Sequence, residues 1–116
     1  MNEEQRLAKA ARQKAWYEKN KEQHMKNVSR RRAEAKDASR KFLQDLKEAT
    51  PCTDCKEHYP YYVMDFDHLY DKQFKVSMMP TLGYSLKKIK EEIAKCEIVC
   101  ANCHRKRTHE RQAGIV

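Results

Sequence analysis

Glycine and proline are scarce in this sequence of 116 residues, which contains two glycines and three prolines. None of them lies between Glu3 and Thr50, and that stretch is rich in Ala, Lys, Arg, Glu and Gln, the residues that best form helices. Apolar residues are also few, because hydrophobic side chains make up 40% of the chain and charged ones 36%, against a usual charged share of about 25%. A large hydrophobic core is therefore excluded, and another interaction must stabilise part of the fold.

The sequence also lacks long apolar runs. No stretch approaches the roughly 20 apolar residues that a membrane span needs. The first residues, Met1-Asn2-Glu3-Glu4, do not have the basic and then apolar pattern of a signal peptide. We therefore expect a cytoplasmic protein that has no membrane partner.

Positive charge is concentrated in the first part of the chain. Residues 1–51 hold 14 Lys and Arg against 8 Asp and Glu, whereas residues 52–116 hold 11 against 9. We interpret residues 1–50 as a basic helical arm. Its cations, including the run Arg30-Arg31-Arg32, would contact the phosphates of DNA. The alternatives are an arm that mediates dimerisation and a helix that is simply solvated.

All five cysteines follow this arm, in residues 51–116. Four of them form two Cys-x-x-Cys pairs, Cys52–Cys55 and Cys100–Cys103, with 44 residues between the pairs. Two such turns can surround one zinc ion as a tetrahedron. Disulfides rarely persist in a reducing compartment, and a redox Cys-x-x-Cys site would lie in a βαβ pattern that is missing here. We predict one structural zinc ion, which would supply folding free energy, and we expect Cys96 to be a buried spare thiol.

Three shorter elements are predicted around the cysteine pairs. The aromatic and β-branched run Tyr61–His68 is typical of a strand. Ser85 is placed to cap a short amphipathic helix, and residues 104–113 read as a helix that Gly114 ends.

Three polar side chains flank the cysteine pairs. Asp67 and His68 end the predicted strand, and His104 directly follows the second pair. A zinc ion that ties the two pairs together would bring these side chains face to face. One Asp and two His beside a basic helix suit metal-assisted hydrolysis of a phosphodiester, which needs a base for water and ligands for a divalent ion.

These motifs resemble the HNH, or ββα-metal, endonuclease family, in its four-cysteine, zinc-containing branch that is common in phages. The resemblance spans residues 52–111 and depends on the cysteine pairs, on Asp65-Phe66-Asp67-His68, and on His104-Arg105 with Thr108 following. It implies an α+β, mostly helical fold in which a small zinc-stapled ββα-metal module, residues 51–116, follows the long basic arm. It also implies an enzyme that hydrolyses phosphodiester bonds in DNA. Such an enzyme would work in the cytoplasm, that of the host if a phage encodes it, and could assemble as a homodimer.

The resemblance assigns a role to each site residue. His68 would be the general base that activates water. Asp67 and His104 would hold the catalytic divalent ion, magnesium or another, apart from the structural zinc ion on the four cysteines. Asp65 lies two residues before Asp67, on the same strand face, and would be a supporting carboxylate.

Two further points concern residues near this site. Helical geometry puts Arg107 and Arg111 on the His104 face of the last helix, so we expect them to grip the scissile phosphate. The family's middle Asn, which steadies the loop of the base, has no counterpart where Lys95-Cys96-Glu97 stands.

The alternative function is a zinc-ribbon DNA-binding or regulatory protein without catalysis, which would not need an acid–base pair.

Overall fold

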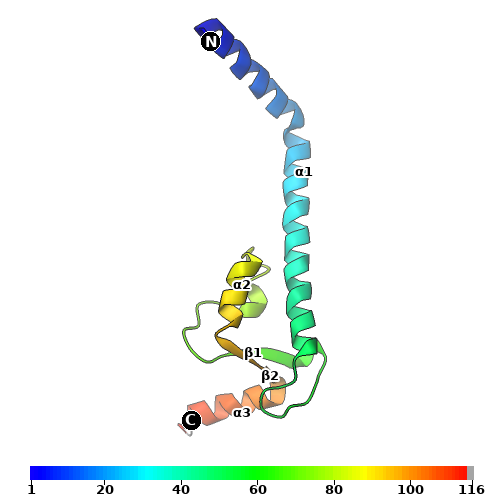
Figure 1. Ribbon diagram of the computed structural model, residues 1–116, viewed down its shortest axis with the longest axis vertical. Helices are drawn as coiled ribbons and strands as arrows, with labels where there is room; N and C mark the ends of the chain where they lie inside the picture. The colour runs from blue at the N-terminus through cyan, green and yellow to red at the C-terminus, as the bar shows by residue number, and fades with distance from the viewer. Residues whose placement is uncertain (115–116) are drawn as a thin grey trace. The chain divides into compact units, whose positions relative to one another are not determined.

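The computed structural model describes residues 1–114, so the last two residues of the predicted 51–116 module lie outside the described part. The chain divides into two compact units, Met1–Glu34 and a second unit that begins at Ala35. Helix α1 (Glu3–Ala49) runs through the division, so its last four turns belong to the second unit (Figure 1). The predicted arm ends at residue 50, whereas the first unit ends at Glu34.

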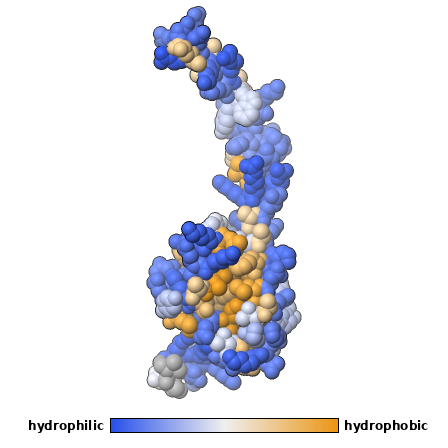
Figure 2. Space-filling view, in the orientation of Figure 1, coloured by the Kyte–Doolittle hydropathy of each residue, from blue (hydrophilic) through white to orange (hydrophobic). Residues whose placement is uncertain are grey.

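The first unit consists of the N-terminal part of α1. A capping box begins the helix, since the Asn2 backbone N–H donates to the Gln5 side chain at 3.0 Å and the Gln5 N–H donates to the Asn2 side chain at 2.8 Å. Almost every side chain here is exposed, and hydrophilic groups cover most of the segment (Figure 2). The predicted helix is confirmed for these residues.

The last turns of α1 pack into the second unit through a few apolar side chains. Leu43 is buried there, with Phe42 and Leu46 partly buried beside it. One core cluster of the unit consists of Leu43, Val76, Met79 and Ile89. Burial of each such side chain contributes about 1.5–3 kcal/mol, which ties the end of α1 to this unit.

Two antiparallel strands form the sheet. Strand β1 (Met64–His68) pairs with β2 (Cys96–Cys100), and the register sets Met64 opposite Cys100 and His68 opposite Cys96. The predicted strand over 61–68 begins three residues too early. Tyr61–Val63 forms a 3-10 turn instead, which follows the fixed φ of Pro60 and is closed by a hydrogen bond from the Val63 N–H to the Pro60 carbonyl.

The connection between the strands contains the short 3-10 helix η2 (Val76–Met78) and helix α2 (Leu86–Ile93). Ser85 caps α2 as predicted, because its side chain accepts a hydrogen bond from the Lys88 N–H at 3.2 Å. Strand β2 continues directly into α3 (Ala101–Gln112), and Gly114 follows with a φ of +72°, as helix C-termini favour.

The second core cluster brings together side chains of both strands and of the two Cys-x-x-Cys turns. It consists of Cys52, Met64, Ile98, Val99, Cys100 and Cys103. The chain is thus mostly helical with a small antiparallel sheet, which confirms the α+β fold class. Within residues 1–114, no helix is both long enough and apolar enough to cross a membrane.

Candidate metal centre and catalytic cleft

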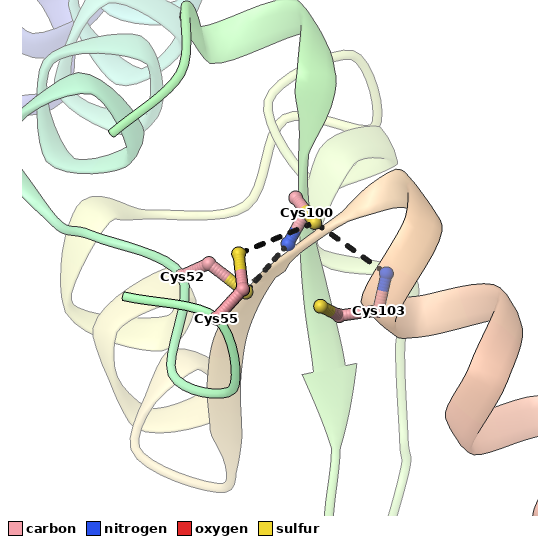
Figure 3. A group of neighbouring side chains, drawn as sticks. All are labelled: Cys52, Cys55, Cys100 and Cys103. Carbon is pink, nitrogen blue, oxygen red and sulfur yellow. Dashed lines mark hydrogen bonds between the residues drawn. The ribbon is translucent and has the colours of Figure 1, made fainter. Parts of the chain in front are cut away.

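Four thiols converge at one end of the sheet. The Sγ atoms of Cys52, Cys55, Cys100 and Cys103 all lie within 4.8 Å of one another (Figure 3). Thiolates bound about 2.3 Å from a tetrahedral zinc ion lie roughly 3.8 Å apart, and Cys55 Sγ lies 4.0 Å from Cys100 Sγ. The four cysteines are therefore positioned to hold one metal ion, as a structural zinc site requires.

Backbone hydrogen bonds prepare these sulfur atoms for a cation. The Cys100 N–H donates to Cys52 Sγ at 3.3 Å, and the Cys103 N–H donates to Cys100 Sγ at 3.4 Å. Burial alone would raise the pKa of Cys52, but hydrogen bonds from the backbone of Cys55, Cys100 and Asp54 bring it down to about 6. A thiolate stabilised in this way is the form that binds zinc.

Cys96, the fifth cysteine, lies apart from this group. Its thiol donates to the Glu92 carbonyl at 3.5 Å, and burial raises its pKa to about 11. The side chain is half-buried, and a neutral thiol in such a place is inert.

A cleft of about 230 Å³ opens beside the sheet, and it combines histidines, a carboxylate and lysines. Its polar lining comes from β1, α1, α3, the loop after β1 and η2. These polar residues are Lys47, Asp65, His68, Lys72, Lys75, Ser77 and His104. The structure thus brings His68 and His104, far apart in sequence, to one concave site with a strong positive charge.

His104 lies between the two carboxylates of β1. Its Nδ1 atom lies 3.1 Å from Asp65 Oδ2, and its Nε2 atom lies 3.5 Å from Asp67 Oδ1. If Nδ1 carries the proton and donates it to Asp65, Nε2 keeps its lone pair and faces Asp67. A carboxylate that orients a histidine in this way is the usual support for a metal-binding imidazole.

Asp67 is buried, with 3% of its surface exposed, and two arginines of α3 neutralise it. Arg111 donates to Oδ1 at 2.8 Å and to Oδ2 at 2.7 Å, while Arg107 donates to Oδ2 at 2.8 Å. Burial alone would raise the pKa of Asp67, but these bonds lower it to about 2. The carboxylate is therefore ionised and already surrounded by positive charge.

The two arginines expected to grip a phosphate are held in different ways. Arg107 is 15% exposed and donates to Asp54 at 2.7 and 2.6 Å, in addition to Asp67 and Glu97. Arg111 is 42% exposed, and its guanidinium pairs with Asp67. Arg107 is thus fixed inside an ion-pair network, whereas Arg111 lies at its open edge.

The roles of Asp54 and Glu97 could not be predicted from the sequence, because both residues pair with α3 only in the folded chain. A further residue without a predicted role is Glu92, a buried acid on α2. Glu92 Oε2 lies 3.7 Å from His68 Nε2, and the Glu92 carboxylate also accepts a hydrogen bond from the Gln73 backbone. The sequence contains a signal that Glu92 is buried, because this acid lies between the apolar positions Ile89 and Ile93 of the amphipathic helix.

The run Arg30-Arg31-Arg32 lies in the first unit, on the exposed surface of α1. Arg30 pairs with Glu34 at 3.7 Å, and an exposed pair of this kind contributes little to stability. All three arginines are therefore accessible to an anionic partner.

Comparisons with known proteins do not identify a relative, since no protein-family model, no curated protein and no solved structure matches this chain.

Proposed function

We propose that this protein is a metal-dependent endonuclease of the HNH type that hydrolyses phosphodiester bonds in DNA. The observation that carries the proposal is the cleft in which His68, His104 and Asp65 meet three lysines. Hydrolysis of a phosphodiester needs a base, a cation site and positive charge for the phosphate, and this cleft supplies residues for each. A zinc-ribbon protein that only binds DNA would not need two histidines and a carboxylate in a concave site.

His68 is the general base in this proposal. Its Nε2 atom is buried against Glu92, so Nδ1 is the ring nitrogen left for a water molecule in the cleft. The Nδ1 lone pair would accept the proton of that water as the water oxygen attacks phosphorus and the P–O bond to the leaving oxygen breaks. Lys72 and Lys75, which line the same cleft, would attract and orient the phosphate.

His104 and Asp67 are the candidate ligands for a divalent ion. His104 Nε2 and Asp67 Oδ1 would hold it, with Asp65 fixing the orientation of the imidazole. When bound, the ion would stabilise negative charge on the phosphate and on the leaving oxygen. In the structure, Arg111 donates a hydrogen bond to Asp67 Oδ1. The guanidinium must therefore leave this oxygen before a cation can bind to it.

The basic arm would add affinity for the DNA backbone. The exposed cations of residues 1–34 include Arg31 and Arg32, and lysines and arginines of this kind contribute affinity that is independent of base sequence and sensitive to salt. A homodimer through the arm is the other proposal for this segment.

Incubation of supercoiled plasmid DNA with the purified full-length chain tests the proposed function. We expect conversion to nicked circles when magnesium or manganese is added, and no conversion when EDTA removes the divalent ion. A shift of the plasmid in a gel without nicking, under every divalent ion tried, would reject the endonuclease in favour of the DNA-binding protein.

Replacement of Arg111 by glutamine is expected to strengthen divalent cation binding. The change removes a positive charge within a few Å of the proposed ligand oxygen, and unit charges about 4 Å apart interact by about 4 kcal/mol at an effective dielectric constant of about 20. The Kd for manganese, measured by calorimetry on zinc-loaded protein, should fall by about tenfold or more. Arg12→Gln is the matched control, because Arg12 is an exposed arginine of the first unit. Equal Kd values for the two variants would show that Asp67 is not a ligand.

A further inference from the structure

Glu92 is a buried acid beside the proposed general base. It is 2% exposed and lies on the inner face of α2. Burial alone would raise its pKa, but hydrogen bonds from Lys95 and from the Gln73 backbone lower it, so the group is an anion. A buried charge is costly unless it has partners, and the partners of Glu92 show what it holds in place.

Each oxygen of Glu92 has a different set of neighbours. Oε1 accepts from the Gln73 N–H at 3.2 Å and from Lys95 Nζ at 3.1 Å. Oε2 lies 3.4 Å from Lys95 Nζ and 3.7 Å from His68 Nε2. One carboxylate therefore joins the loop after β1, the end of α2 and the imidazole at the end of β1.

His68 Nε2 needs a partner at this position. Within residues 1–114, it is the one buried side-chain nitrogen or oxygen atom that makes no hydrogen bond. Glu92 Oε2 lies 3.7 Å from it, a distance slightly longer than a hydrogen bond. A small rotation of either side chain would join them. Since a carboxylate only accepts, Nε2 would then carry the proton, and Nδ1 would keep the lone pair that a base needs.

We propose that Glu92 is the positioning residue for His68: it fixes the imidazole as the Nε2–H tautomer and, through Gln73, holds the loop behind it. This assignment rests on the proposed endonuclease function for its catalytic meaning. In the proposed endonuclease, Glu92 would hold the base and its loop in place of the family's middle Asn, which has no counterpart in the segment Lys95-Cys96-Glu97.

Glu92→Gln tests the tautomer directly. The Gln73 N–H and Lys95 require an acceptor at the Oε1 position, so the amide oxygen will lie there and the amide NH2 will face His68. Nε2 must then accept, the proton moves to Nδ1, and the lone pair is lost from the cleft. Loss of the correct tautomer in a histidine-dependent hydrolase lowers kcat by up to about 10⁴-fold. We expect kcat for nicking to fall by about 10²-fold or more while KM is unchanged.

The tautomer itself is measured by nitrogen NMR of the histidine rings at about pH 8, above the usual histidine pKa. In the wild-type protein we expect His68 to carry its proton on Nε2, and in Glu92→Gln on Nδ1. Glu91→Gln is the matched control, because Glu91 is the exposed neighbour of Glu92 on α2 and should change neither kcat nor the tautomer. Glu92→Gln leaves the charge of Lys95 without its Glu92 partner. If this variant does not fold, the double variant that also carries Lys95→Gln removes that charge and is measured instead.

A double-mutant cycle separates positioning from a general structural effect. In a His68→Ala background, Glu92→Gln should cause no further loss of rate, because both changes remove the same base. A wild-type His68 protonated on Nδ1, or additive losses in the cycle, would overturn the assignment of Glu92. Absence of nicking by wild-type protein that shows the expected tautomers would instead overturn the endonuclease proposal.

Discussion

Replacement of Cys100 by serine is expected to unfold the second unit of the chain. Cys100 ends β2, caps α3 and lies at the centre of the thiol group, with Cys103 N–H bonded to its sulfur atom and Cys55 Sγ 4.0 Å away. Structural zinc sites contribute about 10–16 kcal/mol of apparent folding free energy, which equals or exceeds the whole stability of a small domain. The small clusters of apolar side chains in this unit cannot compensate for such a loss.

Two measurements check this result. Zinc content by atomic spectroscopy should be near one ion per chain for the wild-type protein and near zero for Cys100→Ser. Amide NMR spectra should lose the dispersed signals of the strands in the variant, and in the wild-type protein after treatment with a strong chelator. Cys96→Ser is the control, because Cys96 lies outside the thiol group and should keep both zinc and signal dispersion. A folded, metal-free Cys100→Ser protein would contradict the zinc assignment.

The features that could be predicted from the sequence are those fixed by neighbouring residues. A Cys-x-x-Cys pair brings its two thiols together in one turn, so the two pairs predicted the group of four neighbouring thiols that the structure shows. The capping role of Ser85 is equally local. The start of β1 was predicted wrongly because Pro60 closes a 3-10 turn over residues that otherwise favour a strand.

The features that could not be predicted depend on contacts between distant segments. The end of α1 joins the second unit because Leu43 finds apolar partners on η2 and α2, which its own helix pattern does not specify. Asp54 and Arg107 are 53 residues apart in sequence, and only the fold makes them a bidentate pair. Glu92 was overlooked for the same reason, although an acid on an apolar helix face was a visible signal.

The proposed catalytic roles of His68 and His104 remain predictions, but the structure supports a more specific version of them. Asp65 and Asp67 are alternate residues on one strand, so both face α3 and enclose the imidazole of His104. Sequence spacing places them on that face. Only the fold shows that Asp65 pairs with His104, whereas Asp67 is bound by two arginines.

Replacement of His68 by alanine is expected to abolish most of the nicking activity and to leave the fold intact. The side chain is largely buried at the end of β1, and its cleft contains no second histidine in an equivalent position, since His104 is engaged by the two aspartates. A positioned general base contributes about 10²–10⁴-fold to a rate, so kcat should fall by about that factor. The affinity for DNA should change little, because the lysines of the cleft and the arm are untouched.

Matched measurements distinguish loss of a base from loss of structure. The His68→Ala protein should bind one zinc ion and bind DNA as the wild type does, and free imidazole added to the reaction should restore part of the rate by entering the space that the side chain leaves. His109→Ala is the control, because His109 is an exposed histidine of α3 outside the cleft and should keep full activity. Wild-type rates in His68→Ala would remove His68 from the mechanism, and with it the reason for a buried Glu92 beside the imidazole.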